Sequence, residues 1–137
     1  MTRARAAAAG AVAALAWALA EPIDRRLLRH DYSDVAMLGK LVTRSRAWPF
    51  AGLVLHAANG ALFGLAYRVA RPRGVGAVQL ALLENTVLFP LGLLVDRRHP
   101  ARGERGLAPL VSARGFAQET VRHVLFGAVL RELAADR

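Results

Sequence analysis

The stretch VGAVQLALLENTVLFPLGLLV, residues 75–95, decides the fold class, because nearly every one of its residues is apolar or small. A helix rises about 1.5 Å per residue, so a run of this length can cross the ~30 Å hydrocarbon layer of a bilayer. Glu84 and Asn85 interrupt the run near its middle. A carboxylate at that depth costs roughly 2.5–3.5 kcal/mol on insertion scales. We therefore expect Glu84 to face protein or water and to have a partner.

Three further segments have a similar character, and together the four predict an all-α polytopic membrane protein with four transmembrane helices. The segments are 6–23, 48–69 and 113–134, of which the last is the least hydrophobic. A chain of this length forms one membrane domain, residues 1–137. Because a short Pro- and Gly-containing turn, 70–74, separates the second and third segments, those two are expected to be antiparallel neighbours.

The first segment has two interpretations. Arg3 and Arg5 precede an Ala- and Leu-rich core that ends in Ala18-Leu19-Ala20, which resembles a secretory signal with a small-residue cleavage site. Under this interpretation residues 1–20 are removed. The alternative is a retained span.

An internal repeat favours the retained span. A shift of 63 residues aligns Leu62-Phe63-Gly64 with Leu125-Phe126-Gly127, and Arg68 with Arg131. We therefore hypothesise a duplicated helix hairpin with repeats 1–70 and 71–137. Two spans in each copy would make the repeats parallel.

The connection between the first two spans, 24–47, carries its own amphipathic pattern. Ser33 or Asp34 is suited to cap a short helix in which the apolar residues share one face. Those residues are Val35, Leu38, Leu41 and Val42. We expect this helix to lie in the headgroup region, between spans one and two.

Composition excludes several classes of function. The chain has no cysteine, which rules out disulfides and thiolate metal sites. Its net charge of +9 comes from arginines grouped between the apolar runs, without the motifs of a nucleic-acid binder. Basic residues beside spans are attracted to anionic headgroups. The expected partners are thus membrane lipids and not nucleic acid.

Glycines recur at helical spacing in the second and fourth segments. Small residues at this spacing let helix backbones approach closely. One interpretation is packing within the chain, which we favour; the other is a contact with a second copy or with another membrane protein. The residues are Gly52, Gly60, Gly64, Gly115 and Gly127.

Polar residues of three spans fall at one depth. Counted from the end with the short turn, His56, Glu84 and Glu119 lie within about 3 Å of one level. Neighbouring residues extend this predicted buried polar layer, namely Asn59, Asn85, Arg122 and His123.

The layer supports three interpretations. Glu84 pairs with Arg122 or a histidine and specifies packing, because buried charges are usually paired. Alternatively, Glu84 centres a proton or ion relay of a small transporter. In the third, Glu119, His123 and His56 bind a metal or haem. We favour a binding or assembly component with no catalytic residue, metal or cofactor.

Two stretches resemble small uncharacterised four-helix bacterial inner-membrane proteins. They are His56-Ala57-Ala58-Asn59-Gly60-Ala61-Leu62-Phe63-Gly64, followed by Tyr67, and Arg122-His123-Val124-Leu125-Phe126-Gly127. The resemblance implies a multi-pass inner-membrane location and brings no known activity.

Overall fold

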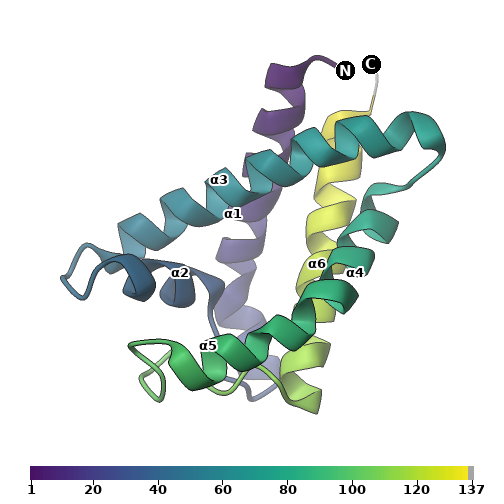
Figure 1. Cartoon of the computed structure of the whole chain (residues 1–137). Helices are drawn as coiled ribbons and strands as arrows, with labels where there is room; N and C mark the ends of the chain where they lie inside the picture. Colours follow the sequence, from purple (N-terminus) through teal and green to yellow (C-terminus); the bar gives the residue numbers. More distant parts are fainter. Residues whose placement is uncertain (136–137) are drawn as a thin grey trace.

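The computed structural model describes residues 1–135, and their secondary structure is helical (Figure 1). The all-α class predicted from the sequence is therefore confirmed. The elements are α1 (Arg3–Leu27), α2 (Asp34–Val42), α3 (Trp48–Ala70), η1 (Arg71–Arg73), α4 (Ala77–Leu88), η2 (Phe89–Leu91), α5 (Gly92–Arg98) and α6 (Ala113–Ala134).

Three helical stretches, not four, are long and apolar enough to cross a membrane. They are Arg3–Leu27, Trp48–Arg73 and Ala77–Arg98. The fourth predicted span forms a helix with the predicted bounds, α6, but its composition does not meet the same criterion. The reason is that α6 carries charged side chains such as Glu119 and Arg122 within its length. By this criterion of length and composition the structure contains three candidate spans, and the predicted fourth span, α6, is not among them.

Glycines bring α1 and α3 into backbone contact. A Cβ added at Gly64 would overlap the carbonyl oxygen of Ala6, and one added at Gly10 would overlap that of Gly60. Small residues on both helices thus allow the two backbones to touch. Gly60 and Gly64 therefore contact α1 within the chain.

The other long helices pack as a second pair. Gly127 of α6 faces the backbone of Val78 in α4, and α6 also contacts α1. The remaining predicted glycine positions, Gly52 and Gly115, meet the carbonyl oxygens of Val35 and Leu110. Figure 1 shows α3 and α4 spreading apart from the turn that joins them. The polar site described below lies in this region.

The third predicted span is not one continuous α-helix. It divides into α4, the single 3₁₀ turn η2 and α5. Pro90 lies within η2, and proline interrupts a helix because it has no N–H and its ring clashes with the preceding turn. The break redirects the chain, so α5 runs under the bundle in Figure 1.

The short helix expected between the first two spans is present as α2. Its N-cap is Ser33, whose hydroxyl accepts a hydrogen bond from the Ala36 N–H, as predicted from the capping pattern. Lys40 holds the loop before α6 in place by donating to Glu104 and to the Arg105 carbonyl at 2.9 Å. This contact fixes α2 between α3 and that loop.

Both ends of the described chain lie at one end of the bundle (Figure 1). Arg5 donates to the carbonyl of Ala135 at 2.5 Å, and Arg71 donates to that of Ala134 at 2.9 Å. Arg68 donates to the carbonyl of Met1 at 3.0 Å. The turn between α3 and α4 therefore shares this end.

Candidate functional site

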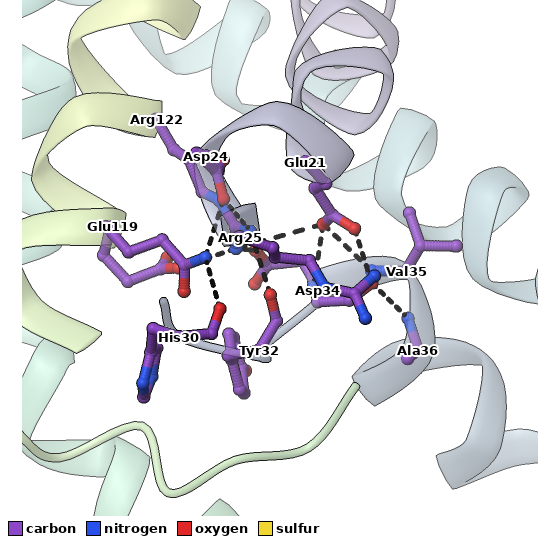
Figure 2. Close-up of polar contacts among 12 residues, drawn as sticks. Glu21, Asp24, Arg25, His30, Tyr32, Asp34, Val35, Ala36, Glu119 and Arg122 are labelled. Carbon is purple, nitrogen blue, oxygen red and sulfur yellow. Dashed lines mark hydrogen bonds and ion pairs between the residues drawn. The ribbon is translucent and has the colours of Figure 1, made fainter. Parts of the chain in front are cut away.

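Arg122 of α6 is the centre of the polar interior, with a side chain only 1% exposed. Its Nε and Nη2 donate to both carboxylate oxygens of Asp24, at 2.7 and 2.8 Å. The second Nη2 proton goes to the carbonyl of Tyr32, and Nη1 donates to Asp34 and Glu119 at 2.9 and 3.1 Å (Figure 2). All five N–H groups of the guanidinium are thus used.

Four carboxyl groups surround this single guanidinium. Asp24, Asp34 and Glu119 bond to it, and Glu21 lies 4.0 Å away. Glu21 also receives the Asp34 backbone N–H at 2.8 Å and the hydroxyl of Ser33, so it caps the start of α2. The cluster holds more negative than positive groups, and neutralising the excess requires protons or a positively charged ligand.

The contribution of α1 to this cluster was not predicted. Trp17, Glu21 and Asp24 follow one another at spacings of four and three residues, so they share one face of the helix. All three are buried. The signal was present in the sequence as a stripe that continues the small residues of α1 along the same helix face. Gln118, which donates to Asp24 at 2.6 Å, was also missed.

A cavity of about 230 Å³ adjoins the Arg122 cluster. Residues of α1, α2, α3, α4 and α6 line it, so it lies where the two helix pairs meet. Its polar lining comprises Asp34, His56, Asn59, Glu84, Glu119 and His123, beside the rings of Trp17, Phe63 and Phe126. A second cavity of about 300 Å³ shares Asp34, Glu84, Glu119 and His123 with the first.

The structure thus places the three residues of the predicted layer, His56, Glu84 and Glu119, around one cavity. His56 and Glu119 are buried, and Glu84 is half-buried. Asn59 lines the cavity but is exposed, contrary to the expectation of burial. Asn85 is buried outside the first cavity and donates to Thr120 at 3.2 Å.

Glu84 does not pair with Arg122, because the guanidinium uses its donors on other groups. Its nearest basic group is His123, whose Nε2 lies 3.9 Å from the Glu84 carboxylate. His123 Nδ1 bonds to the backbone carbonyl of Glu119 at 2.6 Å. A carbonyl only accepts, so Nδ1 carries a proton and Nε2 is directed to Glu84.

His56 shows the same arrangement on α3. Its ring bonds to the carbonyl of Ala14, and its Nε2 has no hydrogen-bond partner among residues 1–135. Trp17 packs edge-to-face between the two imidazoles, with ring centroids 5.3 Å from His56 and 4.7 Å from His123. The Trp17 Nε1 likewise has no partner in the described chain. The cavity wall therefore presents buried polar atoms that a ligand can satisfy.

Next to the cluster, the connection from α1 to α2 holds groups with shifted pKa values. Burial lowers the pKa of His30 below its usual 6.5, and the charges of Arg122 and Arg114 lower it further. At Asp31, burial acts to raise the pKa, but hydrogen bonds from the Gly106 N–H and from Arg25 outweigh it and the net pKa is lowered. These groups secure the loop beneath the cluster.

The hypothesis of a metal site is not supported by the geometry. Among residues 1–135, no three His, Asp or Glu side chains are arranged to hold one metal ion, and this includes His56, Glu119 and His123.

Comparisons of the chain with protein-family models, with curated proteins and with solved structures find no match. The function must be argued from the site itself.

Proposed function

We propose that the protein is a multi-pass component of a bacterial cytoplasmic membrane that binds a small solute in the cavity between α3 and α6. The observation that carries the proposal is the cavity lining, in which carboxylates and the unpartnered Nε2 of His56 converge inside an otherwise apolar bundle. Polar groups retained at such a depth are costly, and an ionisable residue inside a membrane bundle is by default a candidate for a binding site or an ion pathway. Packing in this chain is already provided by the glycine contacts.

The distribution of exposed residues supports a membrane location. On α1, the exposed large residues between the charged ends are Val12, Leu15, Leu19 and Ile23, while Glu21 and Asp24 are buried. In a protein surrounded by water, the apolar side chains would be buried and the acidic ones exposed. An apolar exterior over a polar interior suits lipid as the surroundings.

The same reasoning supports a fourth crossing by α6. Its charged residues Glu119 and Arg122 are buried against α1 and the α1–α2 connection. Its exposed positions between the first and last turns are Phe116, Ala117, Val121 and Val124, all apolar. Mean hydropathy averages the two faces of a helix. It therefore underestimates how well a helix suits the membrane when protein covers its polar face.

Cysteine labelling tests aqueous access to the cavity. Because the chain has no cysteine, Asn59→Cys introduces a single thiol on the cavity lining. Leu62→Cys, one turn further along α3 and 66% exposed on the apolar surface, is the matched control. In intact vesicles we expect Asn59→Cys to react with charged thiosulfonates, faster with a cationic than with an anionic reagent, and Leu62→Cys to react with neither. An unreactive Asn59→Cys would contradict a site for a water-soluble solute.

The distance of 3.9 Å between Glu84 and His123 favours a second candidate function, a proton relay. The two groups share the cavity wall with Glu119, so a proton has successive acceptors across the bundle. In liposomes, Glu84→Gln should abolish any proton flux, whereas Glu132→Gln on the exposed end of α6 should not. Equal flux through both variants would eliminate this candidate.

A further inference from the structure

The polar groups that line the cavity are predominantly hydrogen-bond acceptors. Asp34, Glu84 and Glu119 contribute carboxylate oxygens, and His56 contributes the Nε2 lone pair, because its other ring nitrogen donates to Ala14. His56 is 5% exposed, so this unpartnered nitrogen is buried within the lining. A buried acceptor without a donor is unfavourable, and a ligand that donates a hydrogen bond to it would remove this cost.

The neighbouring positive charge satisfies only part of this set: Arg122 donates to Asp34 and Glu119, but not to Glu84 or to the Nε2 of His56. Arg122 is the cation of the cluster, and its five N–H groups are committed to Asp24, Asp34, Glu119 and the Tyr32 carbonyl. The complement of the cavity is therefore a positive group that carries N–H donors.

The rest of the lining is aromatic. Trp17, Phe63 and Phe126 border the same space, and their ring faces attract organic cations and pack on hydrocarbon. The cavity of about 230 Å³ has room for a small molecule, not for a single ion held by close ligands.

We propose that the ligand of this cavity is a small organic ammonium ion bearing N–H groups, a primary or secondary amine, whose hydrocarbon part lies against Trp17 and Phe126. A primary ammonium group has three N–H donors, one each for the Nε2 of His56 and the carboxylates of Glu84 and Glu119, and a secondary one has two, enough for two of these acceptors. The Nε1–H of Trp17 is available to a hydroxyl on the same molecule. This inference rests on the proposed binding function and specifies the class of ligand.

Trp17 provides the reporter for the test. The chain has two tryptophans, so the full-length variant Trp48→Phe leaves Trp17 as the sole emitter, on the cavity wall. Four probes of similar size separate the contribution of the positive charge from that of the N–H donors. They are butylamine, butanol, butyrate and tetramethylammonium. They are titrated in detergent near neutral pH while the Trp17 emission is recorded.

We expect butylamine to bind at least about tenfold more tightly than butanol or butyrate, a difference of about 1.4 kcal/mol. Tetramethylammonium, a cation without N–H, should bind more weakly than butylamine. Glu84→Gln removes a carboxylate that does not bond to Arg122. We expect this variant to bind butylamine at least about tenfold more weakly than the parent. The control Glu132→Gln removes the same charge from the exposed end of α6 and should leave the affinity unchanged.

The outcomes separate the two proposals. If butanol or butyrate binds as tightly as butylamine, the ammonium ligand is wrong and the binding function stands. If tetramethylammonium matches butylamine, the requirement for N–H donors is wrong. If no probe of any charge changes the Trp17 emission, both proposals fail.

Discussion

Phe63 of α3 and Phe126 of α6 pack edge-to-face in the middle of the bundle, with ring centroids 5.0 Å apart and planes at 90°. They are also the residues that the internal repeat aligns, 63 positions apart in the sequence. Their helices occupy equivalent places, since α3 packs on α1 and α6 packs on α4. The contact lies where two copies of a hairpin would meet, although the duplication itself stays a prediction.

The buried guanidinium gives the sharpest stability prediction. Arg122→Met removes five hydrogen bonds and leaves Asp24, Asp34 and Glu119 without a counter-charge. Breaking one side of a buried ion pair typically costs about 3–5 kcal/mol, because the remaining charge stays desolvated. We expect a loss of that size in the free energy of unfolding, measured in detergent. The matched variant Arg131→Met removes an exposed arginine of the same helix, where about 0–1 kcal/mol is expected. Equal losses would show that Arg122 does not organise the interior.

The glycine contacts give a second prediction, which also separates packing from dimerisation. Gly64→Ala places a methyl group on the carbonyl of Ala6, so α1 and α3 must move apart. Overpacking of this kind costs about 1–3 kcal/mol. The expected result is a lower melting temperature at unchanged oligomer mass. Ala58→Leu, on an exposed position of α3, is the control and should melt like the parent. A change of mass with an unaltered melting temperature would instead favour a glycine-mediated dimer.

Local signals in the sequence predicted the helices well. The α2 cap at Ser33 and the bounds of α6 follow from short-range patterns, since capping and helical periodicity involve residues within one or two turns. The depth count also brought His56, Glu84 and Glu119 to one cavity. Depth along a helix depends only on its rise per residue, and this is nearly constant.

The partners of Arg122 could not be predicted in the same way. Which carboxylates it meets depends on the rotation of each helix about its axis, and this is set by contacts such as Gly64 against Ala6. Asp24 lies 98 positions from Arg122, and Asp34 lies 88. Their meeting is a property of tertiary packing, so a periodic pattern in either segment does not contain it.

A pH dependence is expected from His30. Burial lowers the pKa of its imidazole below 6.5, so the unfolded chain takes up a proton more readily than the folded one. Its contribution to stability is complete above the unfolded pKa and is lost as the pH falls through the folded one. We expect the stability advantage of the parent over His30→Asn to shrink between about pH 7.5 and about pH 5.5. Comparing the two chains at each pH cancels the titration of the carboxylates they share. A constant difference would contradict this role.

Membrane topology tests the proposed crossing by α6. If α1, α3, the α4–α5 segment and α6 all cross, Arg3 and Arg131 lie on one side of the membrane and Arg102, in the loop before α6, lies on the other. If only the three apolar stretches cross, Arg131 lies with Arg102 instead.

Single cysteines at these exposed positions, treated in oriented vesicles with an impermeant thiol reagent, distinguish the two cases. We expect Arg3→Cys and Arg131→Cys to be protected or labelled together, because hydrogen bonds from Arg5 and Arg71 to the end of α6 hold both termini at one end of the bundle. Labelling of Arg131→Cys together with Arg102→Cys would place α6 outside the hydrocarbon layer, and the polar cavity would then be bounded by water on one side.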